Sequence, residues 1–184
     1  MNFLMFEAGI LLWIQEHLRM PVLNEIMIGI TTMGNEGIFW IAVAVVLLIF
    51  KKTRKAGIQC AIAMLLTLLV VNITLKPAIA RTRPYDLIEG LNIIISRPHD
   101  FSFPSGHAAN SFSCAWVMLR RLPKKLGVPA LILAVLIAFS RLYVGVHFPT
   151  DVLGGIAIAI ILAEIGMFAF GKIEKAILKK KAAK

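Results

Sequence analysis

Five long apolar stretches constrain the fold more than any other feature of this sequence. They cover residues 36–50, 57–80, 105–119, 126–143 and 151–170, and a helix needs roughly 20 apolar residues to cross the hydrocarbon core of a bilayer. With 59% hydrophobic and only 16% charged residues, the chain has too few polar side chains to solvate one face of each helix in water. We therefore predict an all-α fold, a polytopic membrane helix bundle with five to six transmembrane helices.

Two shorter apolar runs, residues 3–18 and 22–33, precede these spans and are separated by Arg19 and Pro21. They form either an amphipathic arm at the membrane interface or a sixth, broken span; of the two we favour the arm. A chain of 184 residues leaves no room for a second folded domain. We divide it into an N-terminal helical arm (1–35), a membrane domain (36–172) and a basic tail (173–184).

The basic residues predict which ends of the spans face the cytoplasm, because lysine and arginine accumulate in short cytoplasmic loops. Of the 20 basic residues, 14 occur in three segments, residues 51–55, 120–125 and 171–184, which the five-span arrangement places on one side. We therefore expect a multi-pass protein of the inner (plasma) membrane with a cytoplasmic C-terminus. The loops 82–103 and 143–150 then face the outside or the periplasm. We attribute the net charge of +10 to this topology and not to a nucleic-acid surface.

Three polar clusters that are distant in the sequence meet at the outer ends of the spans. Ionisable residues at the edge of a membrane span are costly unless they pair or face water, which makes them functional candidates. The clusters are Lys76 and Arg83 after the second span, Ser105, Gly106 and His107 at the start of the third, and Ser140, Arg141, His147 and Asp151 around the last loop.

Three cations in these clusters point to an anion. Lys76, Arg83 and Arg141 would repel one another in a low-dielectric site unless a negative group lay among them. Guanidinium groups bind phosphate oxygens as bidentate donors, and an ammonium group binds them as a point charge. The alternative, interfacial cations that reach the lipid headgroups, is sufficient for Arg81 or Arg97 alone. It does not explain why three cations coincide with two histidines and an aspartate.

The remaining cluster residues suit phosphate binding and proton transfer. Asp151 can accept a hydrogen bond from one imidazole nitrogen of His147 and leave the other unprotonated, which makes that histidine a nucleophile or a base. Ser105 is a suitable N-cap for the third helix, and Gly106 lets the backbone approach an anion at the helix N-terminus. His107, in the same turn, is placed to protonate a leaving oxygen.

These residues resemble the three motifs of the type 2 phosphatidic acid phosphatase superfamily, whose membrane branch removes phosphate from lipids. The first motif, lysine, six residues, arginine and proline, is met by residues 76–84. The second, Pro-Ser-Gly-His, is met by residues 104–107, and the third, Ser-Arg, five residues, histidine, three residues and aspartate, by residues 140–151. The resemblance implies a membrane lipid phosphatase whose active site lies at the extracytoplasmic membrane surface.

The resemblance also implies a role for each motif residue. His147, oriented by Asp151, attacks phosphorus to form a phosphohistidine, and His107 protonates the leaving group and then activates water. The mechanism uses no metal and no cofactor. We expect the loop residue Asp100 to serve hydrogen bonds within its own loop. The residues that bind the phosphate are then Lys76, Arg83, Ser105, Gly106 and Arg141.

The motifs do not separate undecaprenyl diphosphatases from phosphatidate or phosphatidylglycerophosphate phosphatases of broad specificity. A short loop from Arg83 to Pro104 and an outward-facing site favour undecaprenyl diphosphate, which is released on the outer leaflet during cell wall synthesis. Dedicated undecaprenyl diphosphatases often carry aspartate where this chain has Gly106, so the broad-specificity enzyme is the alternative. A non-catalytic lipid transporter or scaffold is a second alternative. The expected partners are a phosphorylated lipid and the bilayer; Arg97 and His99 are expected to be solvated loop residues and not ligands of a second phosphate.

Overall fold

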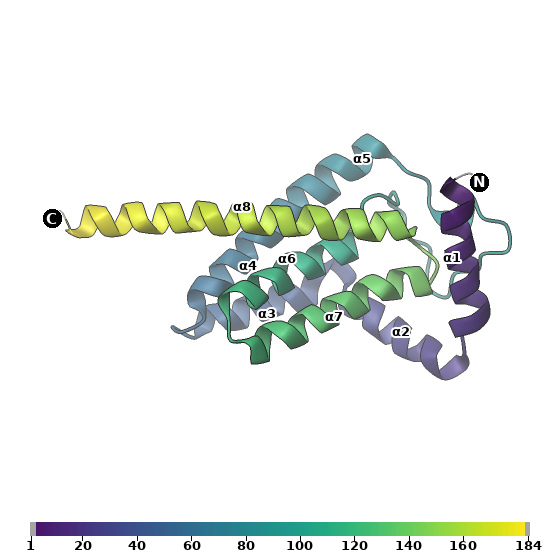
Figure 1. The fold of residues 1–184 in the computed structure, drawn as a ribbon, viewed down its shortest axis with the longest axis horizontal. Helices are drawn as coiled ribbons and strands as arrows, with labels where there is room; N and C mark the ends of the chain where they lie inside the picture. The colour runs from purple at the N-terminus through teal and green to yellow at the C-terminus, as the bar shows by residue number, and fades with distance from the viewer. Residues whose placement is uncertain (1–2, 183–184) are drawn as a thin grey trace.

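Helix α6 (Gly106–Arg121) is the centre of the bundle and packs against α4 (Arg54–Thr67), α7 (Lys124–Tyr143) and α8 (Pro149–Ala182). The computed structural model describes residues 3–182 and contains no strand within them. Helix α3 (Ile38–Ile49) packs mainly against α4 (Figure 1). The predicted all-α membrane helix bundle is confirmed.

The N-terminal helices lie at one end of this bundle. Helix α2 (Pro21–Met33) packs beside α7, and α1 (Phe3–Leu18) lies across the end at which α8 begins (Figure 1). A short 3₁₀ turn, η1 (Asn35–Gly37), joins α2 to α3 with a bend of 47° between the two helices. Helix α4 continues through a π-helical segment, η2 (Leu68–Leu75), into α5 (Lys76–Ile79). The loop that follows begins with the short 3₁₀ turn η3 (Pro84–Asp86).

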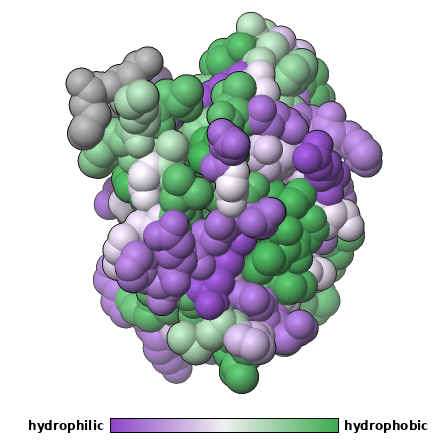
Figure 2. Space-filling view, turned by 90° about the vertical axis from the view of Figure 1, so that its right-hand side faces the viewer, coloured by the Kyte–Doolittle hydropathy of each residue, from purple (hydrophilic) through white to green (hydrophobic). Residues whose placement is uncertain are grey.

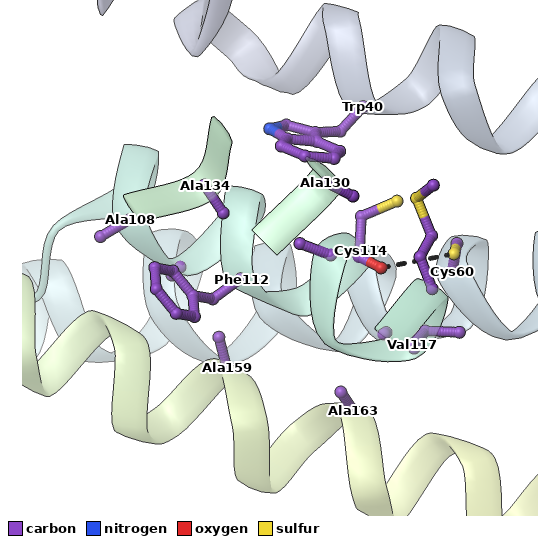
Figure 3. Close-up of a cluster of buried hydrophobic side chains, with 14 of the residues drawn as sticks. Trp40, Cys60, Ala108, Phe112, Cys114, Val117, Ala130, Ala134, Ala159 and Ala163 are labelled. Carbon is purple, nitrogen blue, oxygen red and sulfur yellow. Dashed lines mark hydrogen bonds between the residues drawn. The ribbon is translucent and has the colours of Figure 1, made fainter. Parts of the chain in front are cut away.

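Small side chains allow the central helices to approach closely (Figure 3). The buried alanines include Ala108 of α6, Ala134 of α7 and Ala159 of α8, the pattern that membrane helices use to bring their backbones together. Gly155 of α8 lies so near α6 that an added Cβ would be 2.6 Å from the carbonyl oxygen of Ser105. This packing fixes the first turn of α8 against the first turn of α6.

Within residues 3–182, three helical segments are long and apolar enough to cross a membrane: Arg54–Asp86, Lys124–Tyr143 and Pro149–Ala182. The bent pair α2 and α3 adds a fourth if it forms one broken span. The predicted spans at 36–50 and 105–119 correspond to α3 and α6, which contain 12 and 16 residues. The number of five to six spans, and the placement of the arm at the interface, therefore stay predictions.

Candidate active site

A cavity of about 900 Å³ lies at the end of the bundle where α6 and α8 begin. Figure 2 views the molecule onto this end, where hydrophilic side chains gather beside a hydrophobic patch. The three sequence clusters, which are up to 75 residues apart, meet here. Six of the predicted site residues line the cavity: Lys76, Arg83, Gly106, His107, Arg141 and His147.

The other two predicted residues lie directly behind the cavity wall. Ser105 is fully buried, and its hydroxyl caps α6 by accepting from the backbone N–H of Ala108 at 3.5 Å. Its own backbone N–H donates to the carbonyl oxygen of Asp151 at 2.9 Å, which joins the second motif to the third. Asp151 is also fully buried. The N-cap role of Ser105 is confirmed, while its predicted contact with phosphate stays a prediction.

Arg83 links the loop 82–103 to the loop after α7. It is 4% exposed, its Nε donates to the carbonyl oxygen of Asp100 at 2.8 Å, and its Nη1 donates to the carbonyl oxygen of Val146 at 2.6 Å. These two bonds hold Nη1 3.4 Å from Nε2 of His147. The guanidinium group therefore faces Nε2, the imidazole nitrogen that does not lie beside Asp151.

His147 is a buried, uncharged imidazole in this cavity. It is 1% exposed, and burial, reinforced by the positive charges of Arg83, Arg141 and Lys76, lowers its pKa well below the usual value of 6.5. The imidazole is therefore neutral at neutral pH. Its Nδ1 lies 3.5 Å from Oδ2 of Asp151, longer than a normal hydrogen bond, so the predicted pair is adjacent without being bonded.

Arg141 has the least satisfied guanidinium group among these cations. It is 3% exposed, Nη1 donates to the hydroxyl of Thr31 at 2.6 Å, and the buried Nε has no protein partner. A buried cation without a charged partner in contact is costly. An anion bound in the cavity would provide that partner, which makes Arg141 a strong candidate ligand.

Asp100 extends one expectation from the sequence. It serves hydrogen bonds within its own loop, since Nη2 of Arg83 donates to its carboxylate at 2.5 Å, and the same carboxylate also forms an ion pair with Lys76 at the start of α5. Burial alone would raise the pKa of Asp100, but the hydrogen bonds and charges of these two cations lower it from 3.8 to about 2. Asp100 is therefore ionised across the physiological range, and its single negative charge is shared between two of the three cations.

The N-terminal helices contribute to the site, which no sequence motif indicated. Besides Thr31, the loop residue Asn35 contacts the site through its side-chain oxygen, which lies 3.0 Å from Nε2 of His107. Gly34 makes this approach possible, because an added Cβ would lie 2.6 Å from the His107 ring. One wall of the cavity is thus formed by Thr31, Thr32, Gly34 and Asn35.

Two arginines that the sequence placed at the interface behave differently. Arg97 is exposed, pairs with Asp86 at 3.2 Å and lies over the Tyr85 ring, as expected for a solvated loop residue. Arg81 is only 25% exposed and forms ion pairs with Glu7 and Asp151. The expectation of an interfacial role for Arg81 is therefore wrong: the residue joins α1 to the third motif.

We expect Asp100→Asn to strengthen the binding of inorganic phosphate. The wild-type carboxylate competes with phosphate for Lys76 and Arg83, so its neutralisation should lower the phosphate concentration for half-maximal thermal stabilisation about tenfold, or ~1.4 kcal/mol. Asp86→Asn, which changes an exposed carboxylate of the same loop region, is the matched control and should have no effect. Equal phosphate affinity in the wild type and Asp100→Asn would show that Asp100 does not occupy the phosphate position.

Comparison with known proteins identifies the family. Residues 56–173 match the PAP2 superfamily. An undecaprenyl-diphosphatase of Sulfolobus acidocaldarius is 36% identical over 137 residues, which cover 74% of this chain and 66% of that protein. Among solved structures, LpxE of Aquifex aeolicus superposes with a TM-score of 0.72 at 31% identity, covering 81% of this chain and 87% of that chain. A transmembrane PAP2-type phosphatidylglycerolphosphate phosphatase of Bacillus subtilis gives 0.69 at 29% identity, covering 93% and 85%. The chain therefore belongs to the PAP2 superfamily, as its three motifs indicated.

Proposed function

We propose that this chain is a membrane lipid phosphatase that hydrolyses a lipid phosphomonoester or diphosphate through a phosphohistidine intermediate. The observation that carries the proposal is the meeting of three buried cations with two histidines in one cavity. Lys76, Arg83 and Arg141 suit the oxygens of a phosphate group, and fixed cations stabilise the charge that develops on these oxygens in the transition state. A lipid transporter or scaffold has no need for two histidines beside such a cluster.

The geometry supports a two-step displacement. In the first step, Nε2 of neutral His147 attacks phosphorus, the bond from phosphorus to the leaving oxygen breaks, and His107 donates a proton to that oxygen. In the second step, water attacks phosphorus, His107 takes the proton of the water, and the bond to His147 breaks. Inorganic phosphate leaves, and both histidines return to their starting states. Asp151 stabilises the positive charge that His147 carries as it reacts.

A second cavity supports a lipid substrate. It has a volume of about 290 Å³, lies between α3 and the α4–η2 helix, and shares Glu36, Asn72 and Asn110 with the first cavity. The rest of its lining is apolar and includes Ala44 and Leu65. A hydrocarbon chain in this groove would leave its phosphate group in the first cavity.

Among lipids, we propose undecaprenyl diphosphate as the substrate and undecaprenyl phosphate as the product. The similarity to an undecaprenyl-diphosphatase and a short outer loop support this choice. The alternative, a phosphatidate or phosphatidylglycerophosphate phosphatase of broad specificity, is supported by the Bacillus subtilis structure and by Gly106. A Cβ at Gly106 would lie 3.1 Å from Oδ1 of Asn72, so an aspartate at this position requires Asn72 to move.

We also propose that the active site faces the outside or the periplasm and that the C-terminus is cytoplasmic. The lysine-rich end of α8 lies at the far end of the molecule from α1 and the cavity (Figure 1). Lysine and arginine accumulate on the cytoplasmic side of a membrane protein. The cavity then opens on the side where a lipid diphosphate is released during cell wall synthesis.

The test is phosphate release by the purified protein from undecaprenyl diphosphate, phosphatidate and phosphatidylglycerophosphate, each measured with and without a chelator. We expect the fastest release from undecaprenyl diphosphate, and we expect this release to persist with the chelator, because the cations of the site replace a metal. Equal or faster release from phosphatidate or phosphatidylglycerophosphate would support the broad-specificity alternative. The part of the chain that the structure describes holds no group of three or more His, Cys, Asp or Glu side chains placed to bind a metal ion. Activity that requires added magnesium would contradict the mechanism, and no release from any lipid would contradict the function.

A groove variant tests the lipid-binding role of the second cavity. We expect Ala61→Trp, which places a large side chain in the apolar groove, to lower kcat/KM for a long-chain lipid about tenfold by excluding part of the chain. Hydrolysis of a short, water-soluble phosphate ester should be unchanged. Ala157→Trp, on an exposed position of α8 away from both cavities, is the matched control. An equal loss with both substrates would place the effect outside the groove.

A further inference from the structure

Arg81 is largely buried, although it occupies one of the six unspecified positions between Lys76 and Arg83 of the first motif. Its Nη1 donates to Oδ1 of Asp151 at 2.6 Å, and its Nη2 donates to Oε2 of Glu7 at 2.6 Å. The guanidinium carbon lies 4.1 Å from the centre of the Phe148 ring, which holds the group in place from a third side. One guanidinium group therefore bridges the carboxylate beside His147 and a carboxylate of helix α1.

The two oxygens of Asp151 have different partners. Oδ1 accepts from Arg81, whereas Oδ2 accepts from Ser102 Oγ at 2.5 Å and from the backbone N–H of Phe148 at 2.8 Å. Oδ2 is also the oxygen that lies 3.5 Å from Nδ1 of His147. Because the carboxylate is fully buried, its ion pair with Arg81 strongly affects both its orientation and the charge that His147 experiences.

Glu7 holds the other side of Arg81. It is 1% exposed, and its Oε1 accepts from the backbone N–H and the hydroxyl of Thr150 at 3.0 and 2.6 Å. Thr150 lies in the first turn of α8, where a carboxylate is also stabilised by the helix dipole. Glu7 thereby ties α1 to the turn of α8 that carries Asp151 and fixes the direction of the Arg81 side chain.

We propose that Arg81 and Glu7 are positioning residues that hold Asp151, and through it His147, in the geometry required for attack on phosphorus. The proposal rests on the phosphatase function proposed above. Glu7 lies outside residues 56–173, the part of the chain that matches the family. Through the contacts from Glu7 to Arg81 and from Arg81 to Asp151, helix α1 supports catalysis, in addition to any role at the membrane surface.

The test compares kcat and KM of Arg81→Gln, Glu7→Gln and Arg81→Lys on the lipid that the wild type hydrolyses. We expect kcat to fall on the order of 100-fold in Arg81→Gln and about tenfold in Glu7→Gln, as when the group that orients a reactive imidazole is lost. KM should stay within about twofold because the three phosphate-binding cations are intact. Arg81→Lys keeps the charge but cannot bridge two carboxylates with a fork, so its kcat should lie between Arg81→Gln and the wild type.

A double variant and two surface variants make the test specific. If Glu7 acts through Arg81, the double variant Glu7→Gln/Arg81→Gln should lose no more activity than Arg81→Gln alone. Glu174→Gln and Arg120→Gln remove partners from exposed ion pairs, Lys55–Glu174 and Arg120–Glu164, and should leave kcat unchanged. Thermal unfolding, measured in the detergent that is used for the activity assay, verifies that each variant is folded.

Three outcomes would overturn the proposal. The first is that Glu7→Gln and Arg81→Gln both fold and both have the kcat of the wild type. If Arg81→Gln does not fold, the same conclusion follows when Glu7→Gln and Arg81→Lys have the kcat of the wild type. The second is a raised KM with unchanged kcat, which would assign the two residues to substrate binding. The third is the absence of phosphate release by the wild type itself, which would overturn the proposed function and this inference with it.

Discussion

Replacing His147 with alanine should abolish phosphate release, with a loss in kcat on the order of 10⁴-fold or more, because the loss of a nucleophile removes the whole covalent pathway. The side chain is buried beside Arg83, and the structure places its Nε2 toward that guanidinium group. Phosphate release from the preferred lipid, measured with equal amounts of folded protein, gives the result. In the wild type, rapid quenching with labelled substrate should trap a phosphohistidine that the variant lacks.

The control for this variant must separate chemistry from folding. Alanine removes the ring from a buried position, so His147→Gln, which retains most of the side-chain volume, should show the same loss of activity with a smaller effect on thermal stability. Substantial phosphate release by both variants would contradict the nucleophilic role. A lipid-related function in cells that persists without His147 would favour a transporter or scaffold instead of an enzyme.

Replacing Arg141 with glutamine should reduce kcat/KM roughly 10²- to 10³-fold, the loss typical of removing one preorganised donor from a charged transition state. Arg141 is buried, and its Nε has no protein partner, so its remaining donors are free for phosphate oxygens. In the wild type, inorganic phosphate should raise the melting temperature, because a ligand that binds only the folded state stabilises it. Arg141→Gln should lose most of this increase.

Two further variants test whether charge alone is sufficient at this position. Arg141→Lys keeps the positive charge but not the bidentate geometry, so its activity should recover only in part. Arg120→Gln removes an exposed arginine from the opposite end of α6 and should retain both activity and the phosphate-induced increase in melting temperature. If Arg141→Gln retained the full increase, the phosphate would have to bind elsewhere in the cavity.

Residue type and spacing were sufficient to predict the motif residues of this site. A cation or histidine at the end of an apolar span is costly without a partner, so its presence is informative even without a structure. The N-cap role of Ser105 follows from local backbone chemistry and is found as predicted. The family assignment from the three motifs is also confirmed.

The contacts that complete the site depend on packing between distant segments. Glu7 and Arg81 are 74 residues apart, and Thr31 and Arg141 are 110 residues apart. Such pairs have no periodicity or spacing that a sequence pattern would reveal. Asp100 is similar: its position in a polar loop suggested local hydrogen bonds, and it makes one with Arg83, but the path of the loop also brings it to Lys76, which no pattern in the sequence indicated.

The sequence by itself therefore determined the helical membrane bundle, the three motifs and the chemistry of their side chains, because these follow from apolar span length and from the cost of buried charge. Only the tertiary structure decided which charges neutralise one another. It placed α1 across the end of the bundle, where Glu7 meets Arg81, and brought Asp100 into contact with Lys76 and Arg83. The physical reason is that an ion pair depends on distance in space, which helix packing sets and local sequence does not.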